Sequence, residues 1–135
     1  MESKGFISYD MFRRTCPSHT VLEALSNKWL YLVVMALGRR GRMRFSELQK
    51  LLEGVSPKML TQTLRGLERD GMLQREVFPV VPPRVEYELT PLGREFARLL
   101  VHMLDWSVAH VPDILAARAL YDVAAGDAVT PPAGS

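Results

Sequence analysis

The strongest constraint in this sequence is one stretch, Val55 to Gly71, whose ends and faces are all marked. Ser56 can cap the start of a helix with its hydroxyl, and Pro57 suits the first helical position, where a missing N–H costs nothing. Gly71 can adopt the left-handed conformation that ends a helix. The spacing of three leucines predicts one apolar face, made by Leu60, Leu64 and Leu67.

The other face of this expected helix offers hydrogen-bond donors and positive charge. Its residues are Lys58, Thr61, Gln62, Arg65 and Arg69. A helix that enters the DNA major groove needs such a face, because the Gln amide can pair with adenine and Arg or Lys with guanine. Taken alone, the stretch fits an ordinary solvated helix face equally well.

Length and hydropathy favour one domain with tails. The chain has 135 residues, and its longest unbroken apolar run is Trp29 to Leu37. That run is far shorter than the roughly 18–20 residues of a membrane span. Residues 1–5 lack the apolar core of a signal peptide. We therefore expect a cytoplasmic protein with no membrane partner.

Positive charge is concentrated in the middle of the chain. Residues 28–84 hold 11 Lys or Arg against 5 Asp or Glu, although the whole chain has a net charge of only +2. A basic middle suits a polyanionic partner. Chance clustering on a small protein is the alternative.

The first part of the chain is expected to pack rather than to hang free. Five apolar residues make residues 1–15 an arm suited to contact with a second subunit: Phe6, Ile7, Tyr9, Met11 and Phe12. A short helix should follow from Pro17, with Val21, Leu22 and Leu25 as its inner side. It should break at Ser26-Asn27, where Asn27 tolerates a left-handed backbone.

The next segment, about Lys28 to Arg39, is apolar nearly all round and predicts a central core helix. A buried strand is the alternative, because Val33 and Val34 are β-branched. A basic loop follows, with a short strand at residues 42–44. Its arginines would contact a DNA backbone or simply aid solubility: Arg39, Arg40, Arg42 and Arg44.

A further helix should directly precede the helix expected between Ser56 and Gly71. Ser46 and Gln49 match a capping box, and the helix would run to Gly54. Only Val55 and Ser56 separate the two helices, which together predict a helix-turn-helix.

Two β-prone runs, Met72–Phe78 and Val85–Thr90, follow and predict a β-hairpin, that is, a wing. Prolines between them keep the tip from extending a sheet edge. Glu86 and Glu88 share one strand face, and we expect them to pair with Arg75 or Arg84 rather than to act as a catalytic carboxylate pair.

Thr90-Pro91 predicts the cap of a long helix, about Leu92 to His110, and Pro112 predicts a restart. The expected fold class is therefore mainly α with a small β-hairpin (α+β), a winged helix-turn-helix. The expected organisation is an arm at 1–15, a winged helix-turn-helix domain at 16–110, a short helix at 111–122 and a disordered tail at 123–135.

The residues themselves resemble the HxlR-type family of bacterial transcriptional regulators. One departure is Ser26-Asn27, where members usually carry Gly-Gly before Lys-Trp. The matching pieces run in order over most of the chain: Cys16-Pro17, Lys28-Trp29, Arg44-Phe45-Ser46-Glu47-Leu48, Ser56-Pro57-Lys58-Met59-Leu60-Thr61-Gln62, Leu64-Arg65-Gly66-Leu67-Glu68-Arg69-Asp70-Gly71, Pro82-Pro83-Arg84-Val85-Glu86-Tyr87, and Leu89-Thr90-Pro91-Leu92-Gly93.

The resemblance implies a homodimer, held by its N- and C-terminal helices, that binds double-stranded DNA. The second helix of the helix-turn-helix would enter the major groove, and the wing would touch the flanking backbone or minor groove. A dimer implies a palindromic operator with half-sites about 34 Å apart or a multiple of it. We expect repression. The DNA-binding candidates are Ser56, Pro57, Lys58, Thr61, Gln62, Arg65 and, in the wing, Arg84.

Cys16 is the single cysteine and the candidate sensor. Many members of the family sense electrophiles or oxidants through a cysteine at this place. A helix start at Pro17 and the nearby Arg13 and Arg14 favour a reactive thiolate. In an alternative reading, Cys16 is inert packing, and a small-molecule ligand binds between the dimer's apolar arm and C-terminal helix. A third reading is a constitutive adaptor without sensing.

The sequence gives no sign of a catalytic or metal site. His19 lies near Cys16, but the other histidines, His102 and His110, are eight residues and therefore roughly 12 Å apart on one helix. They cannot share an ion at bond lengths of about 2 Å. Phosphate-binding loops, nucleophile elbows and zinc-finger spacings are not found in the sequence. We therefore expect no cofactor, no metal and no enzymatic activity.

Overall fold

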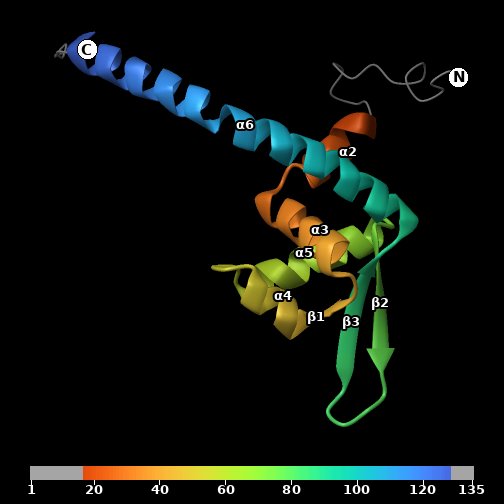
Figure 1. The fold of residues 1–135 in the computed structure, drawn as a ribbon. Helices are drawn as coiled ribbons and strands as arrows, with labels where there is room; N and C mark the ends of the chain where they lie inside the picture. Colours follow the sequence, from red (N-terminus) through yellow and green to blue (C-terminus); the bar gives the residue numbers. More distant parts are fainter. Residues whose placement is uncertain (1–16, 129–135) are drawn as a thin grey trace, which may run out of the picture. The chain divides into compact units, whose positions relative to one another are not determined.

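The structure, a computed structural model, describes residues 17–128, with side chains described from residue 21 to residue 126. Figure 1 shows the elements of the described residues in chain order. The chain divides into two units, with the boundary between Arg98 and Leu99. The elements are α2 (Pro17–Leu25), α3 (Lys28–Arg40), β1 (Met43–Arg44), α4 (Phe45–Leu51), α5 (Pro57–Arg69), β2 (Leu73–Phe78), β3 (Arg84–Leu89) and α6 (Pro91–Ala128). This order confirms the predicted winged helix-turn-helix.

The core of the first unit is built from leucines and valines of its helices and strands. Helix α3 spans Lys28–Arg40, so the predicted core helix is confirmed and the alternative of a buried strand is wrong. Contacts between α3 and α5 hold these two helices together. The buried apolar residues include Leu30, Val33, Val34, Leu37, Met43, Leu48, Leu52, Leu60, Leu64, Leu67, Leu73 and Leu89.

Asn27 starts α3 in a way that differs from the prediction. Its backbone is extended, at φ −143° and ψ 129°, rather than left-handed. Its side-chain oxygen accepts hydrogen bonds from the N–H groups of Trp29 at 2.8 Å and Leu30 at 3.3 Å. Capping two otherwise unpaired N–H donors outweighs the tolerance of asparagine for a left-handed backbone, because asparagine is among the best residues at a helix start.

Helix α5 begins and ends as predicted. The Ser56 hydroxyl accepts the Met59 N–H at 3.0 Å, and Pro57 occupies the first turn. At the other end Gly71 has a φ of +76°, its N–H donates to the Glu68 carbonyl, and the Met72 N–H donates to the Leu67 carbonyl. These paired bonds form a Schellman motif, which satisfies the last carbonyls and turns the chain into β2.

The capping box of α4 was predicted at the wrong residues. The helix starts at Phe45, and the Glu47 carboxylate accepts the backbone N–H of Arg44 at 2.8 Å. Ser46 is therefore inside the first turn, because β1 ends at Arg44 and α4 begins at the next residue.

Ser56→Ala is expected to lower the free energy of unfolding by about 1 kcal/mol, because the Met59 N–H loses its acceptor. Ser46→Ala is the matched control, since no hydrogen bond of the Ser46 side chain is found among the described residues. Chemical denaturation of both variants measures the difference. Equal losses would contradict the assigned helix starts.

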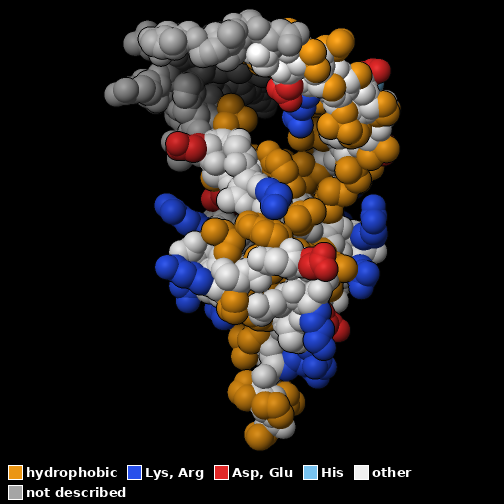
Figure 2. Space-filling model, turned by 90° about the vertical axis from the view of Figure 1, so that its left-hand side faces the viewer, with side chains coloured by type: hydrophobic (Ala, Val, Ile, Leu, Met, Phe, Trp, Pro, Cys, Tyr) orange, Lys and Arg blue, Asp and Glu red, His pale blue; other side chains and the backbone are white. Residues whose placement is uncertain are grey.

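The three strands form one antiparallel sheet in the order β1-β3-β2. Strands β2 and β3 pair from Leu73↔Leu89 to Phe78↔Arg84 and make the wing, the hairpin from Leu73 to Leu89. Only two residues of β1 pair with β3. Figure 2 shows hydrophobic side chains gathered at the free end of the wing, where Val81 is 98% exposed.

The wing leads directly into α6 through Thr90. Its hydroxyl donates to the Gly71 carbonyl at 2.6 Å and accepts the Gly93 N–H at 3.1 Å, so the predicted cap is confirmed. One side chain thus joins the end of α5 to the start of α6. Gly93 is buried, and the carbonyl of Met72 lies against its Cα.

Helix α6 corrects the predicted C-terminal organisation. It is continuous over 38 residues with Pro112 inside it, so the restart at 111–122 is wrong. Proline removes one N–H donor, but good helix formers follow it, and the helix continues. Residues 123–128 are helical rather than disordered, because this segment is rich in alanine. The boundary between units also lies earlier than the expected residue 110.

Several apolar side chains are exposed on the helices of the single chain. In α2, Val21 and Leu22 are more than half exposed, which does not match their predicted inner position. The second unit exposes Leu99, Val101, Met103, Leu104, Trp106, Val108, Val111, Leu115, Leu120, Tyr121 and Val123. Among residues 17–128, no helix carries an apolar stretch long enough to cross a bilayer. The N-terminal arm, Cys16 and the last seven residues lie outside the described part.

Candidate nucleic-acid interface

The outer face of α5 carries three of the predicted site residues. Lys58, Gln62 and Arg65 are exposed and fall at helical spacing on the face opposite the buried Leu60 and Leu64. The structure therefore brings the three longest candidate side chains to one surface of a helix that is fixed to the core. They form the α5 face: Lys58, Gln62 and Arg65.

The remaining α5 candidates are placed less simply. Ser56 and Pro57 are exposed at the start of the helix, and the Ser56 oxygen already accepts the Met59 N–H. Its hydroxyl can still donate outward. Thr61 is half-buried and presents less of its side chain. Its neighbour Thr63 is buried, and its hydroxyl donates to the Met59 carbonyl at 2.8 Å.

The wing arginine, Arg84, is held by two neighbours on the hairpin. Its Nε lies 3.0 Å from a carboxylate oxygen of Glu86, and its guanidinium carbon lies 4.6 Å from the centre of the Phe78 ring. The predicted pairing of Glu86 with Arg84 is thus confirmed. These contacts fix the direction of the side chain and leave it about one-third exposed.

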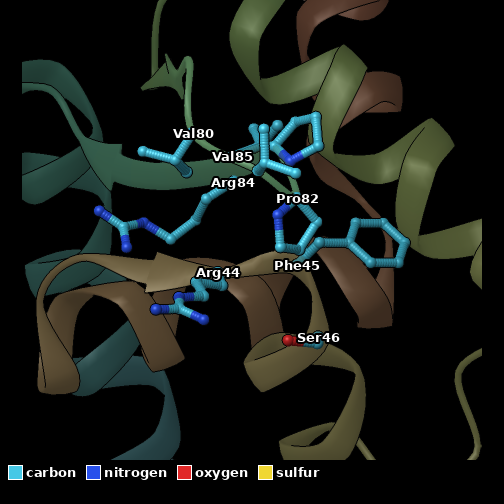
Figure 3. Close-up of a pocket in the computed structure, with 9 residues that line it drawn as sticks. Arg44, Phe45, Ser46, Val80, Pro82, Arg84 and Val85 are labelled. Carbon is cyan, nitrogen blue, oxygen red and sulfur yellow. The ribbon is translucent and has the colours of Figure 1, made fainter.

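A hollow of about 510 Å³ lies between the wing and the start of α4. Figure 3 shows Arg84 and Pro82 reaching it from the wing, and Arg44 and Ser46 from the other side. Two guanidinium groups and a hydroxyl beside valine and proline side chains suit a segment of sugar–phosphate backbone, which alternates anionic and apolar groups.

The loop arginines do not act as one set. Arg39, Arg40 and Arg44 are exposed. Arg42, however, forms ion pairs with Glu76, Glu86 and Glu88, so its predicted contact with a DNA backbone conflicts with its actual partners. Glu88 was expected to pair with Arg75 or Arg84, but it pairs with Arg42. The reason is the sheet order, which places Arg42 over the polar side of the hairpin.

Two connections between the wing and α5 were missed by the sequence reasoning. Arg75 of β2 lies 3.5 Å from Glu68 of α5. Burial raises the pKa of the Tyr87 hydroxyl, on which the charges of Arg75, Glu68 and Arg65 also act. Tyr87 thus stays protonated. Only the strand register, which pairs Arg75 with Tyr87, reveals these neighbours.

Comparison with known proteins gives consistent matches. The HxlR-like helix-turn-helix family model matches residues 24–114. The HTH-type transcriptional regulator YtfH of Escherichia coli is 45% identical over 109 residues, which are 81% of this chain and 86% of the relative. The solved structure of YtfH from Salmonella typhimurium has a TM-score of 0.75 at 44% identity and covers 82% of this chain and 97% of that one.

A further similar solved structure is that of a redox regulator. The redox regulator HypR in its reduced form has a TM-score of 0.66 at 34% identity, covering 75% of this chain and 98% of that one. The family and these relatives are transcriptional regulators rather than enzymes. With a winged helix-turn-helix, a polar α5 face and a match over most of its length, this chain is a transcriptional regulator that belongs to the HxlR-like helix-turn-helix family.

Proposed function

We propose that this protein is a dimeric repressor that reads a palindromic operator with helix α5. The α5 face carries the proposal: Lys58, Gln62 and Arg65 are exposed together on a helix whose other side is buried. Gln62 pairs bidentately with adenine, and Arg65 or Lys58 pairs with guanine. At the start of the helix, the DNA backbone is contacted by Ser56, Pro57 and Thr61.

The wing and the hollow position the protein on the flanking backbone. Arg84 and Arg44 contact phosphates across the hollow, and the apolar end of the wing contacts sugars. The exposed apolar side chains of residues 99–123 support a dimer, because exposed apolar area of this kind marks protein–protein contacts.

The experiment is selection of duplexes from a randomised library by the full-length protein. The expected product is an inverted repeat with half-sites about 34 Å apart or a multiple of it, bound more weakly as salt rises. Sedimentation should give a dimer on the selected duplex. If the selected duplexes share no sequence motif, sequence-specific binding is overturned. If they share a direct repeat or a single site, only the palindrome is overturned.

We further propose that Cys16 senses electrophiles or oxidants. The support comes from two similar proteins of solved structure, the redox regulator HypR in reduced and oxidised forms and the regulator YodB in reduced and diamide-treated forms. This chain has one cysteine, Cys16. Adduct formation, a mixed disulfide, or a bridge between two copies of Cys16 would each change the dimer.

Diamide is expected to raise the Kd of the wild-type protein for the selected duplex by about tenfold or more. Cys16→Ser should abolish that response. Anisotropy before and after diamide measures it. An unchanged response in Cys16→Ser would favour the alternative function, a regulator gated by a small-molecule ligand at the dimer interface. A thermal-shift screen of metabolites on both proteins then identifies the ligand class.

A further inference from the structure

Arg42 lies among three carboxylates of the wing. Its Nη1 is 2.5 Å from Glu76 and 3.4 Å from Glu86, and its Nη2 is 3.0 Å from Glu88. The hydrogen bond that Arg42 donates to the Glu76 carboxylate raises the pKa of Arg42 further above its usual value, so the guanidinium keeps its charge. Arg42 therefore joins a network rather than a single pair.

The network crosses the whole sheet. Arg42 comes directly before the edge strand β1, Glu86 and Glu88 belong to the middle strand β3, and Glu76 belongs to the far strand β2. One side chain thus connects all three strands. By contrast, the backbone ladder between β1 and β3 has only two residue pairs.

The carboxylates need a cation at this place. Glu76 and Glu86 are directly opposite each other in the register of β2 and β3. Like charges in opposite positions destabilise a strand pair. Because Arg42 lies against both carboxylates, it turns this repulsion into an attraction across the hairpin.

The same network reaches the hollow. Glu86 contacts Arg42 through one oxygen, and its other oxygen lies 3.0 Å from Arg84. The direction of Arg84, which faces Arg44 across the hollow, therefore depends on a carboxylate that Arg42 holds in place.

We propose that Arg42 is a positioning residue for DNA binding, which braces the wing against β1 and aligns Arg84 through Glu86. It does so without contacting DNA itself. The part of this inference that concerns DNA binding rests on the proposed function. The bracing of the wing can be measured in the free protein.

The first test is hydrogen exchange of the wing amides in free protein. Arg42→Ala should speed exchange in β2 and β3 about fivefold, the size expected of a partly exposed ion-pair network. Arg40→Ala removes a nearby exposed arginine for which no ion pair is found among residues 21–126, and it should leave wing exchange unchanged. Equal exchange in wild type and Arg42→Ala would overturn the brace.

The second test separates bracing from charge. The triple variant Glu76→Gln, Glu86→Gln and Glu88→Gln makes the protein more positive by three charges. If only charge mattered, it would bind the selected duplex more tightly than wild type. If Arg42 braces the wing, the triple variant and Arg42→Ala should each bind the selected duplex about five- to tenfold more weakly than wild type. The salt dependence of binding by Arg42→Ala should equal that of wild type, because no phosphate contact is lost.

Tighter binding by the triple variant, or a salt slope reduced by about one in Arg42→Ala, would overturn the positioning role. Failure of wild-type protein to select any duplex would overturn the proposed function instead. The exchange result would then still decide whether Arg42 braces the wing.

Discussion

Gly93→Ala is expected to destabilise the first unit by roughly 3 kcal/mol, the upper end of the usual cost of overpacking. An added Cβ would overlap the carbonyl oxygen of Met72 and press on Leu89. That carbonyl cannot simply move away, because it accepts the Thr90 N–H at 3.0 Å. The gain in helix propensity from alanine, about 1 kcal/mol, is too small to offset the overlap.

Gly66→Ala is the matched control for this prediction. Gly66 lies inside α5, and a Cβ there would meet nothing within 4 Å. The substitution should stabilise the protein by up to about 1 kcal/mol through helix propensity. Denaturation of both variants measures the two opposite signs. A Gly93→Ala protein as stable as wild type would contradict the close contact between α6 and Met72.

The double variant Gln62→Ala and Arg65→Ala should lose about a thousandfold in affinity for the selected duplex. Each bidentate contact to a base is worth roughly 1–3 kcal/mol of discrimination, and both side chains are exposed on one face. Binding to a scrambled duplex should fall much less, because phosphate contacts carry most of the non-specific affinity. Anisotropy with both duplexes gives the specificity ratio.

Arg69→Ala serves as the control for this double variant. It removes one positive charge near the end of α5, and it should weaken binding to the selected and the scrambled duplex to a similar, small extent. Thermal unfolding of the double variant should match wild type, since the replaced side chains are exposed. If the double variant still discriminates between the selected and the scrambled duplex, α5 does not read the sequence.

Local signals explain how much of the fold could be predicted. Ser56, Pro57 and Gly71 act within a few residues of themselves, so the bounds of α5 followed from the sequence. The pairing of Arg84 with Glu86 was predictable for the same reason, because both lie on one face of one strand. The candidate α5 face required only helical spacing.

Features that depend on tertiary context could not be predicted in the same way. The sequence leaves Arg42 either to a DNA backbone or to solubility, because the sheet order alone brings Glu76 and Glu88 to it. The spacing of Ser46 and Gln49 predicts a capping box, but the helix already begins at Phe45, directly after β1, and Glu47 takes that role. Pro112 predicts a break on its own, whereas its neighbours keep the helix continuous.

Thr90 couples two helices that have different tasks. Its hydroxyl is bonded at once to the carbonyl of Gly71, where α5 ends, and to the N–H of Gly93, in the first turn of α6. A rotation of that first turn must therefore either break a short hydrogen bond or carry the end of α5 with it. The start of α6 and the helix that carries Gln62 and Arg65 are therefore mechanically coupled through this one hydroxyl.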